Sequence, residues 1–269
     1  MNFYDNFTNK HLKIAHRGYR SIRAENTLSA FEQSISKFDF IELDIQVTKD
    51  YELVVFHDYK LERTTDINKN NRFLFNGSYN IYDYTFDELR LLDIGSWFIK
   101  DDPFGAIKDG LVKKEELENL EIQKLLTLED ILIFVEKKNI ALNIELKDCS
   151  YIDDEKFVLK VNNTIKKLNI TTPLLISSFN HNYLKLFKQH NSKIETAANV
   201  ENKHPKNLID YLKNLEVSAC HICSNLVDST PIKELNSQGI VTSVFTVNDK
   251  KKQKLYYEKG VKAIFTDIL

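Results

Sequence analysis

Residues 40–47 read Phe40-Ile41-Glu42-Leu43-Asp44-Ile45-Gln46-Val47, and apolar and polar side chains alternate from residue 41 onward. Successive side chains of a β-strand point to opposite faces, so the polar residues here share one face. Residues 140–147 read Ile140-Ala141-Leu142-Asn143-Ile144-Glu145-Leu146-Lys147 and again place their polar residues in one row. Most buried parallel strands are apolar on both faces. Two strands with one polar face therefore indicate where the chemistry of this protein lies.

Short β-type runs recur along the rest of the chain, and helical patterns separate most of them. The expected strands are residues 12–15, 40–47, 140–146, 174–179, 194–199, 217–223, 240–247 and 261–266. Eight strands that alternate with helices over about this length predict a (β/α)₈ barrel. If the apolar rows face the outer helices, the polar rows point into the barrel mouth.

Periodicity and capping residues also predict helix positions. Leu28, Phe31 and Ile35 are expected on the inner face of the first helix. Thr230 is expected to cap a later helix whose first residue is Pro231.

The stretch from Tyr59 to Leu126 is too long for an ordinary connection between a strand and a helix. It contains apolar and aromatic residues of its own: Phe73, Phe75, Tyr79, Tyr82, Tyr84, Phe86, Leu89, Leu92, Trp97 and Phe98. We expect one barrel domain over residues 1–269, with residues 59–126 as a small insertion that caps the barrel mouth. The alternative is a partly disordered loop, because residues 111–121 are polar enough to be mobile.

The composition argues against several classes of function. The 269 residues carry a net charge of -2, so the basic excess that nucleic-acid binding requires is missing. No apolar run approaches the roughly 18 residues that span a bilayer. The first residues have neither the cationic start nor the apolar core of a secretion signal, so a cytoplasmic location is expected. We expect no nucleic-acid partner and no transmembrane segment, and the oligomeric state stays open.

Three cysteines argue against a disulfide framework in a chain of this length. Cys220 and Cys223 resemble half of a zinc site. They are expected on opposite faces of one strand, where they cannot share a metal ion.

Glu42, Asp44 and Glu145 form a candidate metal site at the barrel mouth. Three carboxylates held together repel one another unless a cation neutralises them, and hard oxygen ligands suit Mg²⁺ or Ca²⁺. The alternative is a structural ion-pair network with Lys147 or a nearby arginine. These residues by themselves favour neither interpretation.

Two histidines are expected beside these acids. The link after the first polar-faced strand is too short for a parallel crossover, so the chain reverses there as a hairpin. Pairing Thr48 with Leu53 places His57 opposite Asp44, and opposed residues point to the same face. His16 ends the first strand, where barrel enzymes carry catalytic groups. The two imidazoles beside inward acids favour general acid and base catalysis.

Arg17 and Lys147 supply two fixed cations. A guanidinium and an ammonium near a divalent cation are what a phosphate oxyanion requires. One histidine would remove a proton from the nucleophile, and the other would give a proton to the leaving oxygen. No Gly-rich phosphate loop, G-x-S-x-G elbow or dinucleotide fingerprint competes with this interpretation. The combination predicts phosphodiester cleavage.

Nearly the whole chain resembles the glycerophosphodiester phosphodiesterase family. The joint order of short motifs carries this resemblance: His16-Arg17-Gly18, Glu25-Asn26-Thr27, Ile41-Glu42-Leu43-Asp44, Val54-Val55-Phe56-His57-Asp58, Arg63-Thr64-Thr65, Gly95-Ser96-Trp97-Phe98, Thr127-Leu128-Glu129-Asp130, Asn143-Ile144-Glu145-Leu146-Lys147, Ser177-Ser178-Phe179, Thr246-Val247-Asn248 and Phe265-Thr266-Asp267. Each motif alone is weakly specific, whereas their order is highly specific.

The resemblance implies metal-dependent hydrolysis of glycerophosphodiesters, such as deacylated phospholipid headgroups, to sn-glycerol 3-phosphate and an alcohol. It also implies a barrel with an insertion between its second and third strands. The implied roles are a general base and a general acid at His16 and His57, a divalent cation at Glu42, Asp44 and Glu145, and phosphate binding at Arg17 and Lys147.

Four residues depart from those common in the family: Ala24, Tyr51, Leu126 and Phe245. At Phe245, where a Trp is common, an indole N–H donor is lost, which affects substrate contacts at the mouth. Two alternatives stay open at this point. Lysophospholipase D-type action on lysophospholipids would need an apolar acyl channel, and a catalytically idle barrel would serve as a binding module. The retained cluster of acids and histidines speaks against the idle barrel.

Overall fold

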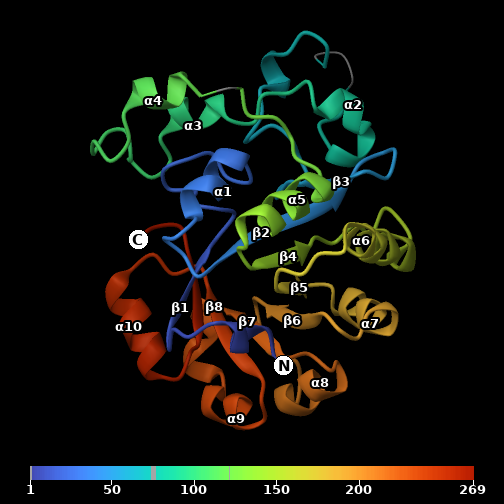
Figure 1. The fold of residues 1–269 in the computed structure, drawn as a ribbon, viewed down its shortest axis with the longest axis vertical. Coiled ribbons are helices and arrows are strands. Elements are labelled where there is room, and N and C mark those ends of the chain that lie inside the picture. Colours follow the sequence, from blue (N-terminus) through green and yellow to red (C-terminus); the bar gives the residue numbers. More distant parts are fainter. Residues whose placement is uncertain (1, 74–76, 121) are drawn as a thin grey trace.

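The computed structural model describes residues 2–73, 77–120 and 122–269, and these form a closed barrel of parallel strands wrapped by helices (Figure 1). The barrel strands are β1 (Leu12–Ala15), β2 (Phe40–Val47), β4 (Leu142–Leu146), β5 (Leu174–Ser178), β6 (Glu195–Val200), β7 (Ala219–Cys223), β8 (Val241–Phe245) and β9 (Ala263–Thr266). Each strand pairs in parallel with the next, and β1 also pairs with β9, which closes the ring. The predicted (β/α)₈ barrel is confirmed.

Helices connect the barrel strands and lie around the outside of the barrel (Figure 1). They are α1 (Leu28–Ser34), α5 (Leu128–Lys138), α6 (Asp154–Leu168), α7 (His181–His190), α8 (Leu208–Asn214), α9 (Ile232–Ser237) and α10 (Lys250–Glu258), with the 3₁₀ helix η4 (Ser224–Ser229) before α9. The hydroxyl of Thr27 accepts the Ala30 N–H at the start of α1. Thr127 and Asp130 form a capping box at the start of α5. Within the described ranges, no helix combines the length and the apolar character that crossing a membrane requires.

Two of the predicted helix details are wrong. Leu28, the first residue of α1, is 39% exposed rather than on the inner face. The buried face of α1 includes Ala30, Phe31 and Ser34 instead. The N-cap of α9 is Pro231 rather than Thr230, whose hydroxyl donates instead to the carbonyl of Leu226 at 2.7 Å.

The two faces of β2 separate as its alternation predicts. Ile41, Leu43 and Ile45 belong to the large apolar cluster that lies between the strands and helices and includes Ile131 of α5. Phe40 belongs to a smaller cluster within the barrel. Because the polar residues of β2 share the face of Phe40, they point into the barrel.

The 3₁₀ helix η1 (Phe3–Asn6) fills the N-terminal end of the barrel. The hydroxyl oxygen of Tyr4 lies 3.0 Å from Nε2 of His221 and 2.9 Å from Oγ of Ser243. Burial lowers the pKa of His221 to about 3. With this end packed, the opposite end, where the strands terminate, is where a site can form.

The hairpin after β2 forms, but its predicted register is wrong by one residue. In β3 (Leu53–Val55), Leu53 pairs with Val47 rather than with Thr48. Thr48 lies opposite Glu52, because its N–H donates to the Glu52 carbonyl at 2.9 Å. The turn between them therefore consists of residues 49–51, and Tyr51 adopts a φ of 63° there.

The insertion lies between the second and third barrel strands, as predicted, and its described residues pack into two apolar clusters. Its short elements are η2 (Ile67–Lys69), η3 (Ile81–Asp83), α2 (Phe86–Leu89), α3 (Ser96–Asp101) and α4 (Lys114–Glu118). One cluster packs on Val54 and Phe56 of the hairpin. The other packs around Phe98 and contacts Ala24 in the loop between β1 and α1. The packed clusters argue against the disordered-loop alternative for the described residues, while Phe75, one of the predicted apolar anchors, lies outside them.

Candidate active site

A cavity of about 530 Å³ lies at the end of the barrel where the strands terminate. All seven residues predicted for the site line it: His16, Arg17, Glu42, Asp44, His57, Glu145 and Lys147. They come from the segment directly after β1, from β2, from the segment after β3, and from β4 and the residue that follows it. The structure therefore brings together residues that are up to 131 positions apart, from His16 to Lys147.

The three predicted carboxylates form one group. Ligand oxygens of Glu42, Asp44 and Glu145 lie within 4.8 Å of one another, and among the described residues this is the group of His, Cys, Asp and Glu spaced to hold a metal ion. Glu42 pairs with Asn143 in the strand register and Asp44 pairs with Glu145, which places the three acids side by side. Glu42 and Asp44 are each only 1% exposed.

Protein donors hold one oxygen of each carboxylate. The Arg17 backbone N–H donates to Oε2 of Glu42 at 2.9 Å. Asn26 donates to Oδ2 of Asp44 at 3.0 Å, and Asn199 donates to Oε2 of Glu145 at the same distance. These contacts orient the three acids.

Burial and mutual repulsion make it costly for these three acids to be ionised together. Burial raises the pKa of Glu42 well above its ordinary value, and the charges of Asp44 and Glu145 raise it further. Burial also raises the pKa of Glu145, with Lys147 opposing this effect. Although burial opposes it, the charges of His57, Arg17 and Lys147 lower the pKa of Asp44. Hard oxygen donors of this kind suit a divalent cation such as Mg²⁺ or Ca²⁺.

Lys147 contacts the acids from the end of β4. Its N–H donates to the Ile45 carbonyl at 3.1 Å, which continues the strand ladder. Nζ lies 3.0 Å from Oε1 of Glu145 and 3.8 Å from Oδ1 of Asp44. Although burial opposes it, these acids raise the pKa of Lys147. The ion pairs expected for a structural network with Lys147 are therefore present, and they involve the same carboxylates as the candidate metal site.

A tight turn directly after β1 positions Arg17. Gly18 adopts a φ of 78°, and a Cβ at this position would lie 2.8 Å from the Ala30 Cβ, so this close approach to α1 requires glycine. The Arg17 guanidinium contacts Glu25 at 2.9 Å through Nη1 and Asp44 at 3.4 Å through Nε. Arg17 is thus fixed with its charge beside the carboxylate cluster.

His16 is held by a carboxylate from the far end of the chain. Its Nδ1 lies 2.7 Å from Oδ1 of Asp267, and the amide of Asn248 holds Asp267 through two hydrogen bonds of 2.8 Å. Burial lowers the pKa of His16, the Arg17 charge lowers it further, and Asp267 opposes both. With Nδ1 occupied by the carboxylate, Nε2 is the nitrogen available for proton transfer.

His57 reaches the cavity by a different route from the predicted one. The register places Phe56 opposite Asp44, whose carbonyl accepts the Phe56 N–H at 3.0 Å. His57 lies beyond the end of β3, and the Gln46 amide donates to the carbonyls of Phe56 and Asp58 at 2.9 and 2.8 Å. These bonds hold the segment on either side of His57 against β2. Nδ1 of His57 lies 2.6 Å from Oδ1 of Asp58, which again leaves Nε2 for proton transfer.

Several residues of the site were not predicted as functional. The predicted motifs contain Glu25, Asp58 and Asp267, but their roles as partners of Arg17 and the histidines depend on contacts in space. Asn199 could have been found from its inward row near the end of β6. The rest of the cavity lining includes four aromatic residues: Tyr59, Phe179, Phe245 and Phe265.

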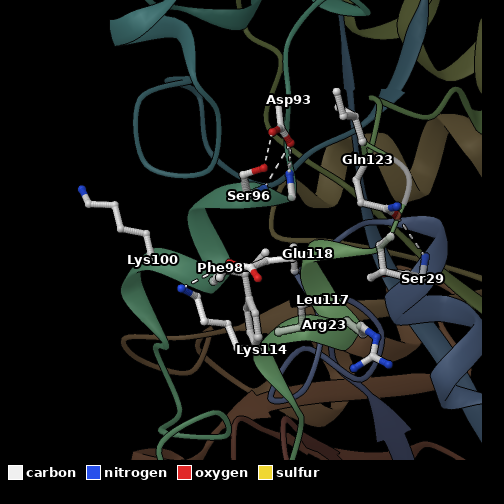
Figure 2. A pocket seen from close by; sticks show the side chains of 15 residues that line it. Arg23, Ser29, Asp93, Ser96, Phe98, Lys100, Lys114, Leu117, Glu118 and Gln123 are labelled. Atoms are coloured by element: carbon white, nitrogen blue, oxygen red, sulfur yellow. Dashed lines mark hydrogen bonds and ion pairs between the residues drawn. The ribbon is translucent and has the colours of Figure 1, made fainter.

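A second cavity, of about 610 Å³, lies between α3, α4 and the loop that connects β1 to α1 (Figure 2). Figure 2 shows Asp93 at the start of α3, where it accepts hydrogen bonds from Ser96, and the ion pair between Lys114 and Glu118. Phe98 contributes to its wall. None of the seven predicted site residues lines this cavity, so the candidate active site is the cavity at the barrel mouth.

Comparison with known proteins agrees with this geometry. The glycerophosphoryl diester phosphodiesterase family model matches residues 16–269. A glycerophosphodiester phosphodiesterase from Bacillus altitudinis is 33% identical over 262 residues, which cover 94% of this chain and 93% of that protein. A phosphodiesterase from Oleispira antarctica, solved in complex with the product sn-glycerol-3-phosphate, is 27% identical with a TM-score of 0.78 and covers 99% of this chain and 96% of its own. A glycerophosphodiester phosphodiesterase from Parabacteroides distasonis, 23% identical with a TM-score of 0.72, covers 97% of this chain and 94% of its own and shares the fold.

The family match includes every residue of the cavity described above, from His16 at the end of β1 onward. The chain belongs to the glycerophosphoryl diester phosphodiesterase family and is an enzyme of that class.

Proposed function

We propose that this enzyme hydrolyses glycerophosphodiesters to sn-glycerol 3-phosphate and an alcohol by general acid and base catalysis at His16 and His57. One observation carries the proposal: two histidines, each with Nδ1 bound to a carboxylate, line the same cavity as three clustered acids and two fixed cations. The complex of the Oleispira antarctica relative with sn-glycerol-3-phosphate supports this choice of product.

Glu42, Asp44 and Glu145 would hold a divalent cation, either Ca²⁺ or Mg²⁺. Their ligand oxygens are close enough to share one ion, and carboxylates are the donors that these ions prefer. When bound, the cation would neutralise negative charge on the phosphoryl oxygens.

The chain's own residues supply the proton transfers. Arg17 and Lys147 bind the phosphate and oppose the charge that develops on it. His16, whose pKa is lowered by burial, has its Nε2 free to accept the proton of the nucleophile. His57 gives a proton to the leaving alcohol. Such acid and base groups typically contribute roughly 10²-fold to 10⁴-fold in rate.

Lysophospholipase D-type action on lysophospholipids is the second candidate function. Two aromatic side chains at the cavity, Tyr59 and Phe179, are 45% and 41% exposed and would offer apolar surface to an acyl chain. A lysophospholipase D from Homo sapiens is 43% identical over 65 residues, 24% of this chain.

We also propose that residues 1–269 act as one domain in which the insertion, residues 59–126, borders the mouth as a cap. Within the insertion, Tyr59 lines the cavity, whereas Trp97 and Phe98 do not. A cytoplasmic location stays a prediction.

The test is a substrate panel. The purified protein is incubated with glycerophosphocholine, glycerophosphoethanolamine and a lysophosphatidylcholine, each with Ca²⁺, Mg²⁺ or chelator. Release of glycerol 3-phosphate from the first two supports the main proposal, and cleavage of the lysolipid alone supports the second candidate. Turnover of none of them would refute both.

A further inference from the structure

Arg63 lies near the start of the insertion and contacts two carboxylates at once. Its Nε and Nη2 donate to Asp58 at 2.5 and 3.0 Å. Its Nη1 and Nη2 donate to Glu25 at 3.1 and 2.6 Å. The planar guanidinium suits such two-point contacts, which a lysine cannot reproduce. The guanidinium also lies 6.0 Å from the Trp97 ring, within the same insertion.

Each of these carboxylates holds a residue of the proposed machinery. Asp58 contacts Nδ1 of His57, and Glu25 accepts a hydrogen bond from Nη1 of Arg17. Glu25 is only 6% exposed, so its position depends on the cations that pair with it. Arg63 itself is 44% exposed and lies outside the cavity lining.

We infer that Arg63 is a positioning residue that fixes His57 through Asp58 and Arg17 through Glu25, and so couples the insertion to catalysis. The inference rests on the proposed function, because the general acid role of His57 is part of it. Without Arg63, Asp58 keeps its contact with His57 but loses the two bonds that orient its carboxylate. A displacement of about 1 Å in a catalytic group can lower a rate by about 10²-fold.

The test uses the leaving group to detect the acid. Glycerophosphocholine needs protonation of its leaving oxygen, whereas the p-nitrophenyl ester of glycerol 3-phosphate needs little. The rate with the first ester divided by the rate with the second therefore reports how well His57 works. We expect Arg63→Met to lower this ratio by about 10-fold or more, with Arg63→Lys in between. A role in folding alone would lower both rates together and leave the ratio unchanged.

Two controls distinguish an effect of Arg63 on His57 through Asp58 from a nonspecific effect of losing an arginine in the insertion. Arg90→Met removes an exposed arginine of the insertion, paired with Asp87 at 3.2 Å, and should leave the ratio unchanged. In a double-mutant cycle, Arg63→Met should add nothing to the ratio once Asp58→Asn is present, because both act on His57. Additive effects on the ratio would overturn the inference.

The outcomes distinguish this inference from the proposed function. If the wild-type protein hydrolyses neither ester, the proposed function is wrong. If the wild-type protein hydrolyses both and Arg63→Met keeps the wild-type ratio, the positioning role alone is wrong. Should Arg63→Met fail to fold in a thermal melt, an unchanged ratio for Arg63→Lys would overturn the inference in the same way.

Discussion

We expect the free energy of unfolding of this barrel to depend on pH through one buried histidine, His221. His221 is fully buried, and burial lowers its pKa to about 3 from the ordinary value of 6.5. Between these pH values the unfolded chain binds a proton that the folded chain does not. The contribution of His221 to stability is therefore complete above pH 6.5 and is lost progressively as the pH falls toward 3. A pKa unit corresponds to about 1.4 kcal/mol, so lowering the pH from 6.5 to about 5 costs about 2 kcal/mol.

The perturbation is His221→Gln, which removes the titration and keeps an acceptor for the Tyr4 hydroxyl. Urea unfolding at pH 6.5 and at about pH 5 gives the free energy of unfolding of each protein. We expect the variant to lose about 2 kcal/mol less than the wild type between the two pH values. His190→Gln, on the outer helix α7, is the matched control and should behave as the wild type. If His221→Gln keeps the full wild-type loss, the burial argument is refuted.

Three predictions concern the site. His57→Ala should slow hydrolysis of glycerophosphocholine by roughly 10²-fold to 10⁴-fold but slow hydrolysis of the p-nitrophenyl ester far less, whereas His16→Ala should slow both reactions. Equal defects of the two variants in release of the first leaving group would contradict separate acid and base roles. Glu145→Gln should weaken Ca²⁺ or Mg²⁺ binding in a calorimetric titration, and unchanged affinity would count against the metal site. Phe98→Ala should lower the free energy of unfolding by about 3–5 kcal/mol and leave the ratios of rates with different headgroups intact, because Phe98 is buried away from the cavity at the barrel mouth. Tyr59→Ala should change those ratios, because Tyr59 lines that cavity. The reverse pattern in substrate assays would contradict this assignment.

The polar rows of β2 and β4 could be predicted because they depend on a local rule. Alternation along a strand assigns Glu42, Asp44 and Glu145 to one face, and a parallel register then brings them together whatever the rest of the chain does. The end of β1 similarly identifies His16, since catalytic groups of barrels gather where strands end.

Contacts across long sequence separations could not be predicted in this way. Asp267 holds His16 although the two residues are 251 positions apart, and no periodicity relates them. The register of the hairpin depended on the conformation of Tyr51, a residue that seldom adopts a positive φ. His57 reaches the cavity because Gln46 holds the segment around it, which is a side-chain contact that a strand pattern does not contain.

We propose that the cavity at the barrel mouth cleaves a phosphodiester with a divalent cation held by Glu42, Asp44 and Glu145. The most direct measurement follows glycerophosphocholine by ³¹P NMR with dialysed, chelator-treated protein, before and after addition of Ca²⁺ or Mg²⁺. We expect no turnover before addition and release of glycerol 3-phosphate after it. Full turnover in excess chelator, or no glycerol 3-phosphate with either ion, would contradict it.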